Sequence, residues 1–352
     1  MKTYYPVGDT FAVQHWSKKL TVEALAETYA IRFMGKGQNS MIQYKEEAKQ
    51  VGEKITYGLR VKLSGEGVDG DNILENNEEK LTTYSDALWL DQLRHAVRSG
   101  GAMSEHRVHF NTRNEAKDGL KDWWADRVDT SLFNQMGGIA SGVGTKYTGM
   151  QAAVDPIDAG DTDHWFMPEG KTAVTDVASA STSCVFKLSL IDTFVAKAKT
   201  ISPLIRPIKI KGKEYYVCFL HPYQVRDMRT NTDTGQWLDI QKAAMMGGKI
   251  SGNPIFTGAL GEYNGVILHE SNRVPLEPGY TDLRRAIFAG AQAAVVGFAK
   301  GYNGNKFKWR EKMFDYDNEL GVAAGLIWGL KKTRYNSKDF ATVICPTVAN
   351  AS

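Results

Sequence analysis

The segment TRNEAKDGLKDWWADRVDTSLFNQMGG, residues 112–138, has the clearest helix pattern in the chain. Thr112 and Glu115 stand three residues apart, as a capping box requires, and the two closing glycines supply a C-terminal stop. The spacing predicts a helix over 113–136, about 36 Å long at about 1.5 Å per residue, which favours a scaffold strut. Apolar residues recur at helical spacing, namely Ala116, Leu120, Trp123, Trp124, Val128 and Leu132.

Two adjacent tryptophans lie in the middle of this helix. Neighbouring helical residues point about 100° apart, so both rings cannot occupy the centre of a narrow apolar stripe. At least one of the two should therefore be buried. The residues expected to form the core of the strut are Leu120, Trp123, Trp124 and Val128.

The region before the helix has the period of a β-strand. Apolar residues alternate with mostly polar or basic ones over 54–63. A turn-forming segment follows at 64–77, and an extended segment returns over about 81–97, so the sequence predicts a long hairpin. Because a two-stranded ribbon is marginally stable alone, we expect its apolar face to lie on an adjacent subunit.

The turn of this hairpin is acidic. Six acids lie between 66 and 79, with no basic residue before Lys80, so the tip should seek a basic surface. Candidate inter-subunit contacts are Tyr57, Leu59 and Val61 on the stem, Glu66, Asp69, Asp71 and Glu75 on the tip, and Arg94 and Arg98 on the flanking segment.

Composition excludes several classes of protein. The chain has 352 residues, 42% of them hydrophobic, which suits two or three folded domains, and its net charge of +3 does not indicate a dedicated nucleic-acid binder. No apolar run approaches the roughly 18 residues of a membrane span, and the N-terminus lacks the apolar core of a signal peptide. The three cysteines, an odd number without metal-type spacing, are expected to be buried thiols in a reducing compartment.

A search for chemistry finds no catalytic, cofactor-binding or metal-binding set. The best acidic cluster comprises Asp155, Asp158, Asp161, Asp163 and His164. A metal-dependent hydrolase could use such a cluster, but no supporting base or nucleophile accompanies it, and an acidic surface loop is the commoner meaning. We therefore expect no enzyme activity and no cofactor.

A second alternative comes from a basic stretch with interleaved aromatic residues at 300–312. Such a pattern can bind nucleic acid by base stacking and phosphate contact, although it more often forms a strand with one solvated basic face. Its members are Lys300, Tyr302, Lys306, Phe307, Lys308, Trp309, Arg310 and Lys312.

Five groups of residues resemble those of a tailed-phage major capsid family typified by the coliphage N-four. They keep their order over about 16–340 and are long and unusual, which makes a chance match improbable. The matching segments are Asp91–Val97, Asp122–Asp129, Phe219–Arg226, Asn253–Gly258 with Leu268–Ser271, and Ala289–Ala293.

The resemblance implies an α+β fold of the Hong Kong 97 capsid type and a structural role. It implies hexamers and pentamers of an icosahedral head around double-stranded DNA, assembled in the host cytoplasm without a membrane, with portal and scaffolding or decoration proteins as further partners. The implied divisions are an N-terminal arm at 1–43, an extended loop at 44–106, a peripheral domain at 107–185 with the spine helix 113–136, an axial domain at 186–309, and C-terminal strands at 310–352 returning to the peripheral domain.

Overall fold

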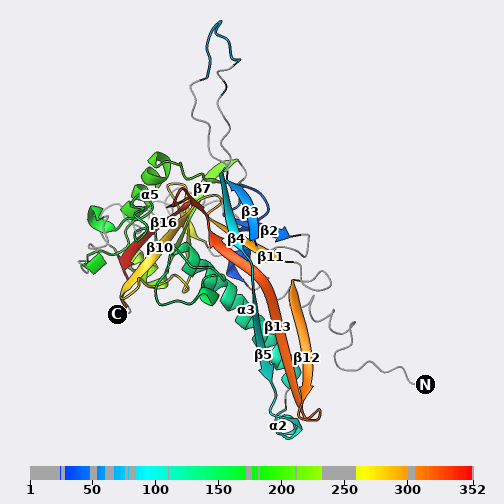
Figure 1. The fold of residues 1–352 in the computed structure, drawn as a ribbon. Coiled ribbons are helices and arrows are strands. Elements are labelled where there is room, and N and C mark those ends of the chain that lie inside the picture. The colour runs from blue at the N-terminus through cyan, green and yellow to red at the C-terminus, as the bar shows by residue number, and fades with distance from the viewer. Residues whose placement is uncertain are drawn as a thin grey trace.

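The computed structural model gives an α+β protein with two six-stranded sheets and one long helix between them (Figure 1). It describes residues 24, 28–47, 54–59, 67–75, 78, 84–109, 111–171, 177–178, 180, 183–210, 212–231, 259–299 and 306–350. One apolar core joins the two sheets, and the side chains of Trp124, Phe219 and Trp328 are among its fully buried members.

The first sheet is built around one 14-residue strand, β13 (Glu319–Lys332). Its first half lies between β12 (Phe307–Phe314) and β5 (Asp91–Arg98), and its second half pairs with β11 (Ala294–Ala299). The N-terminal part of the chain completes this sheet through β2 (Ile42–Glu47) and β1 (Met34–Gly35), which are joined by parallel pairing to β11 and to each other.

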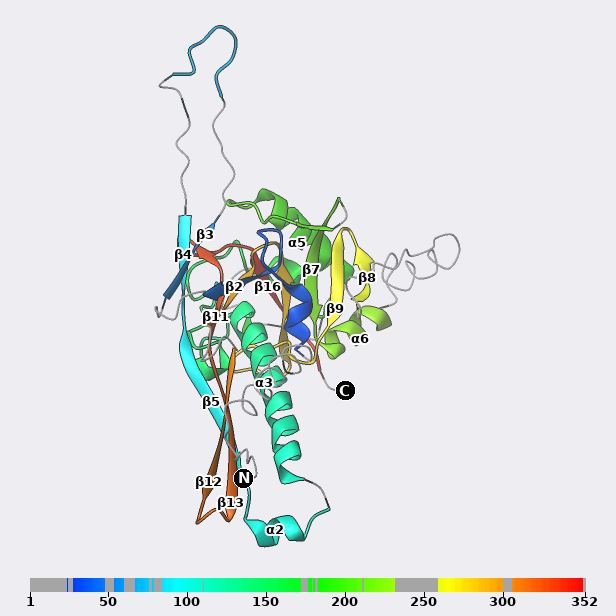
Figure 2. The same ribbon diagram turned by 90° about the vertical axis from the view of Figure 1, so that its right-hand side faces the viewer.

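The long helix α3 (Thr112–Met136) packs on one face of this sheet, next to β13 and β5 (Figures 1 and 2). The predicted helix is confirmed to within one residue at its start. The predicted cap is wrong, because the Asn111 side chain, and not that of Thr112, accepts the N–H groups of Arg113 and Asn114 at 3.0 and 3.3 Å. Asparagine is at least as good an N-cap as threonine, and the extended backbone of Asn111 suits that position.

The second sheet has the order β16 (Thr342–Val348), β10 (Leu283–Ala289), β7 (Lys213–Leu220), β9 (Val266–Glu270) and β8 (Ala259–Tyr263). A short strand, β6 (Ile208–Ile210), also pairs with β7, and α5 (Leu188–Thr200) and α6 (Pro222–Thr230) lie beside this sheet in Figure 2.

Smaller elements link these layers. They are the 3-10 helices η1 (Tyr29–Phe33), η2 (Thr145–Tyr147) and η3 (Pro168–Gly170), the helix α2 (Ala102–His106), and the two-residue strands β14 (Arg334–Tyr335) and β15 (Lys338–Asp339). None of the helices in the described ranges is long and apolar enough to cross a membrane.

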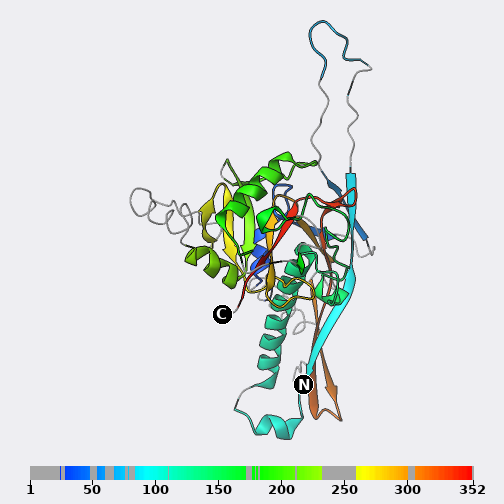
Figure 3. The same cartoon turned by 90° about the vertical axis from the view of Figure 1, so that its left-hand side faces the viewer.

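The hairpin forms from β3 (Lys54–Leu59) and β4 (Tyr84–Trp89), in antiparallel register. The returning segment was expected to stay in the hairpin until about residue 97. It leaves at Leu90 instead, because the next eight residues, β5, pair with β13 of the first sheet. Figures 1 to 3 show the described tip of the hairpin projecting away from the body, at the opposite end from α2.

The C-terminal strands divide between the two sheets. The expected boundary at 309/310 falls inside β12, which together with β13 lies on the sheet with α3. The last strand, β16, does not return to that sheet, since all seven of its residues pair with β10. The sequence of β16 does not alternate between apolar and polar residues, because every residue of this strand is buried. The sequence pattern therefore could not assign the strand to one sheet or the other.

Candidate assembly interface

The base of the hairpin packs on its own chain. Tyr57 and Leu59 are only 3% and 5% exposed, so the expectation that these two side chains face a neighbouring subunit is wrong. Leu88 of β4 lies so close to β11 that a Cβ added at Gly297 would come within 2.6 Å of it. The glycine therefore lets the ribbon lie flat on the sheet, and the sheet supplies the partner surface that a two-stranded ribbon needs.

A polar contact also stabilises the base of the hairpin. The Tyr57 hydroxyl donates a hydrogen bond to the Asp86 carboxylate across the hairpin, at 2.9 Å. Burial, and then the negative charge of Asp86, raises the pKa of Tyr57, so this hydroxyl stays protonated and available as a donor. Lys331 of β13 forms an ion pair with the same Asp86 carboxylate, which ties the ribbon to the first sheet.

The described residues of the hairpin tip are mostly exposed. Asp69, Asp71 and Glu75 are exposed, and their contact with a neighbouring subunit stays a prediction. Two apolar side chains lie among them, Ile73 at 71% and Leu74 at 60% exposure. The other two candidates of this hairpin, Val61 and Glu66, lie outside the described residues.

The two flanking arginines lie on β5. Arg94 and Arg98 are both exposed and thus free to face another molecule. Arg98 forms an ion pair with Glu319, and its guanidinium lies 4.4 Å from the centre of the Phe314 ring. These contacts hold Arg98 against the first sheet while leaving 55% of its side chain exposed.

Three of the four residues expected to form the core of the helix are buried. Leu120, Trp124 and Val128 are at most 1% exposed, and the Trp124 ring meets Phe307 of β12 edge to face at 5.2 Å. Trp123 is half-buried and stacks on His95 of β5 at 4.3 Å. The helix therefore supports the sheet that displays Arg94 and Arg98 on β5.

The sequence pattern missed Asp129 as an anchor for the N-terminal segment. Its buried carboxylate accepts the backbone N–H groups of Tyr29 and Ala30, each at 2.9 Å. Burial raises the pKa of Asp129, although these two donors and Arg273 oppose the shift. Within the expected arm at 1–43, residues from Thr28 onward are thus attached to their own chain, and the segment 1–23 lies outside the described residues.

The acidic loop of residues 155–163 is partly buried. Asp155 accepts a hydrogen bond from Arg285 at 2.6 Å, and Glu277 accepts another at 2.6 Å. The same guanidinium donates to the carbonyl of Gly137 at 2.7 Å, at the end of α3. Arg285 is 1% exposed, so this cluster is a buried link from the second sheet to the long helix. Burial alone would lower the pKa of Arg285, but the two carboxylates raise it.

A second buried group lies in the same loop. His164 Nδ1 is 2.9 Å from the Asp161 carboxylate, which also accepts the backbone N–H of Asp339 at 2.7 Å. Burial by itself raises the pKa of Asp161, but the hydrogen bond and charge of His164, together with the Asp339 N–H, lower it. The expectation of a solvated acidic loop is wrong for Asp155, Asp161 and His164. Asp158 is exposed as expected, and Asp163 is half-buried and pairs with Lys338.

Two aromatic residues of the basic stretch at 300–312 are buried. Phe307 and Trp309 are each 1% exposed and pack toward α3, so they are not available to stack on nucleic-acid bases. The Lys306 ammonium lies 4.5 Å from the Tyr44 ring and 5.2 Å from the Phe298 ring. Lys300 and Tyr302 lie outside the described residues.

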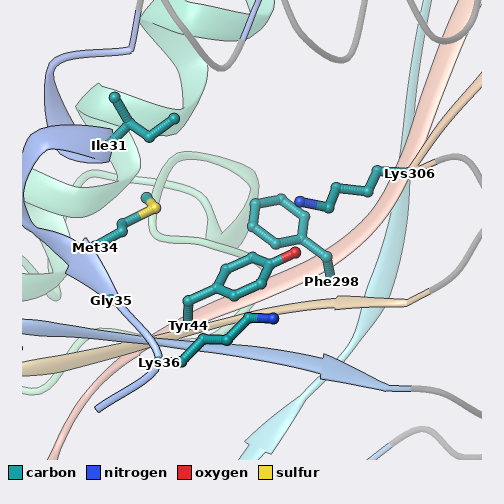
Figure 4. A pocket seen from close by; sticks show the side chains of 7 residues that line it. All are labelled: Ile31, Met34, Gly35, Lys36, Tyr44, Phe298 and Lys306. Atoms are coloured by element: carbon teal, nitrogen blue, oxygen red, sulfur yellow. The ribbon is translucent and has the colours of Figure 1, made fainter. Parts of the chain in front are cut away.

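Lys306 borders a cavity of about 250 Å³ (Figure 4). Its lining is mostly apolar, with two lysine side chains: Ile31, Met34, Gly35, Lys36, Tyr44, Phe298 and Lys306. Burial, and after it the nearby Lys36 charge, lowers the pKa of Lys306, while Glu46 opposes the shift.

The part of the chain that the structure describes contains no recognisable metal-binding or thiol-based site. No group of three or more histidine, cysteine or acidic side chains is placed to hold a metal ion there. The three cysteines are buried free thiols, as expected, and burial raises the pKa of Cys218 and Cys345. The features that stand out are instead a projecting hairpin and the sheet and helix that support it.

Comparison with known proteins places this architecture among virus shell proteins. The chain is 32% identical to the capsid protein of Ralstonia phage GP4, with 99% of each chain covered and a TM-score of 0.77. The capsid of the cyanophage Pam1 shares the fold at 18% identity, with 93% and 94% coverage and a TM-score of 0.69. The class defined by the fold is therefore the phage capsid proteins.

Sequence comparison assigns the family. A family model described as phage capsid protein matches residues 4–351, and the major capsid protein of Pseudomonas phage KPP25 is 30% identical over 93% of both chains. The chain belongs to this phage capsid protein family, and it is a structural protein of a bacteriophage capsid.

Proposed function

We propose that this chain is the principal shell subunit of an icosahedral phage head. Many copies associate into hexamers and pentamers, which close around double-stranded DNA. The observation that supports this role best is the hairpin, whose base is buried on its own sheet while its acidic and apolar tip projects into solvent. A projecting arm with a rigid base is suited to bind a neighbour, and the proposed mechanism is association and not catalysis.

The proposed domain plan is that of the Hong Kong 97 type, in the subfamily typified by the coliphage N-four. The N-terminal arm occupies 1–43, the extended loop 44–106, and α3 is the spine helix. Packing of β12 and β13 against α3 supports assigning residues 307–332 to the peripheral domain. Pairing of β16 with β10 supports assigning residues 342–348 to the axial domain instead.

The proposed partners follow from this plan. Other copies of the chain are the main ones, with portal and scaffolding or decoration proteins in addition, and packaged DNA lies against the inner surface. Each contact can be weak, since association costs offset much of the gain from buried area, yet a closed shell persists through many simultaneous contacts. Assembly takes place in the host cytoplasm, and the product is the virion capsid.

Negative-stain imaging of the purified full-length chain tests this function. We expect closed particles of uniform size, and monomers at every concentration and salt condition would contradict the proposal. A variant in which Ser64–Lys80 is replaced by a short Gly-Ser turn should remain folded by circular dichroism and assemble poorly. Normal particles from that variant would show that the tip is dispensable.

A further inference from the structure

The cavity beside Lys306 is formed by parts of the chain that lie far apart in the sequence. Four residues between 31 and 36, two of them in β1, line one side of it, and Tyr44 of β2 and Phe298 of β11 line the other. Lys306 lies just before β12 and completes the lining. A molecule bound in this cavity would therefore contact both the N-terminal segment and the first sheet.

The two ends of the cavity differ in polarity (Figure 4). Ile31 and Met34 lie at one end and present apolar side chains. At the other end, the Lys306 ammonium and the Tyr44 hydroxyl point toward each other. The ring of Phe298, which is only 1% exposed, forms an apolar wall beside the ammonium group. The cavity is thus amphipathic, with an apolar end and an end that offers hydrogen-bond donors.

The polar end carries more positive than negative charge. Lys36 and Lys306 both line the cavity, and among the described residues neither has a carboxylate within ion-pair distance. Burial and the Lys36 charge lower the pKa of Lys306, against the opposing effect of the exposed Glu46 carboxylate. An anion bound near both ammonium groups would offset their repulsion and the lost hydration. Burial, and then Glu46, raises the pKa of Tyr44, so its hydroxyl stays protonated and can donate to the same anion.

The size and lining of the cavity restrict the ligand. Its volume of about 250 Å³ exceeds the roughly 150 Å³ that holds a benzene molecule in a protein interior, so a fused two-ring system with one anionic group fits. The Met34 thioether and the rings of Tyr44 and Phe298, which are 5.6 Å apart, favour an aromatic body. A singly charged carboxylate suits this mostly apolar cavity better than a phosphate, whose larger charge costs more to remove from water.

We propose that this cavity is a binding site for a small aromatic carboxylate. The carboxylate accepts hydrogen bonds from Lys306 and Tyr44, and the ring system packs between Met34 and Phe298. Because the ligand contacts residues 31–36 and the first sheet together, its binding strengthens the attachment of the N-terminal segment to the folded body. The site depends on the fold of one subunit and not on the proposed shell function, so each can fail without the other.

Titration calorimetry of the purified, unassembled full-length chain with 2-naphthoate tests the site. We expect one binding event per subunit, with a dissociation constant on the order of 100 μM for a ligand of this size. The neutral analogue 2-naphthalenemethanol has the same rings and should bind about tenfold more weakly, because it lacks the charge that Lys306 recognises. Saturating 2-naphthoate should also raise the thermal midpoint of the chain. Absence of saturable binding, or equal affinity for the two probes, would overturn the proposal.

Three variants locate the binding within the molecule. Lys306→Met removes the charge and should weaken 2-naphthoate binding about tenfold without changing the affinity for the neutral analogue. Lys308→Met makes the same charge change two residues further along the chain, outside the cavity lining, and should bind as the original chain does. Ile31→Trp fills the apolar end, keeps both lysines and should abolish binding of both probes. Circular dichroism confirms the fold of each variant, and a folded Lys306→Met or Ile31→Trp variant that binds 2-naphthoate as tightly as the original chain would overturn the assignment.

Discussion

Two acid-rich loops of this protein have nearly the same composition and opposite roles. The loop at 155–164 has four aspartates and a histidine, and the hairpin tip at 66–79 has six acids. In the first, Asp155, Asp161 and His164 are at most 5% exposed and bonded to their own chain. In the second, the described acids face solvent and have no cation of their own chain on the tip.

The comparison shows that the hydrogen-bond and ion-pair partners of the acidic side chains, and not the composition of the loop, determine what an acidic loop does. A carboxylate leaves water only where a cation or N–H donors replace its hydration. Arg285 supplies the cation for Asp155, and His164 with the Asp339 N–H supplies the donors for Asp161. The tip acids have charges that a second molecule can satisfy, so the first loop serves stability and the second is proposed to serve recognition.

The largest expected effect is at Arg285. Arg285→Ala leaves the buried carboxylates of Asp155 and Glu277 without a cation, and should lower the free energy of unfolding by about 3–5 kcal/mol. Denaturant unfolding followed by tryptophan fluorescence measures it. Lys338→Ala, which removes the exposed partner of Asp163 in the same loop, serves as control and should leave the midpoint nearly unchanged. Equal midpoints for both variants would contradict the division between buried and exposed pairs.

The Asp161 and His164 pair should give the next effect. Asp161→Ala with His164→Ala removes a buried hydrogen-bonded pair and leaves the Asp339 N–H without an acceptor, at a cost of about 2–4 kcal/mol. Asp158→Ala is the matched change at an exposed aspartate of the same loop and should fall within about 0.5 kcal/mol of the original chain. Thermal melts of the three proteins decide whether Asp161 is structural.

A pH titration gives a further test of the difference between the buried and the exposed acidic loop. Because the folded pKa of Asp161 is lowered, its charge contributes stability above about pH 4, and this contribution is lost as the pH falls below that value. The stability gap between the original chain and Asp161→Asn should therefore be constant near neutrality and narrow in acid. A parallel curve for Asp161→Asn would disprove the buried-pair account.

The smallest effect on folding is expected at the tip. Asp69→Asn, Asp71→Asn and Glu75→Gln together should change the free energy of unfolding by less than about 0.5 kcal/mol, since these groups are exposed. Particle yield should nevertheless fall, and the salt dependence of assembly should weaken.

The Tyr57→Ser and Leu59→Ser double variant should instead destabilise the subunit itself. Circular dichroism measures the loss of folded subunit, and sedimentation measures the yield of particles.

The sequence determined the local elements of this protein by itself. Helical spacing in 112–138 predicted α3 and its buried residues, and the alternation over 54–63 predicted β3, because both patterns depend only on neighbours along the chain. The acidity of the tip was evident for the same reason. The motifs indicated a phage major capsid protein, and the comparisons confirmed that broader assignment.

Only the tertiary structure decided which surfaces are free. The apolar side of β3 is covered by the first sheet, Asp155 meets Arg285 from 130 residues away, and the cations of β5 and β12 meet through β13. None of these contacts is encoded in local spacing, since each depends on the order in which distant strands pair. Burial and charge pairing are properties of that arrangement, and they separate the anchored parts of the chain from the parts that remain exposed.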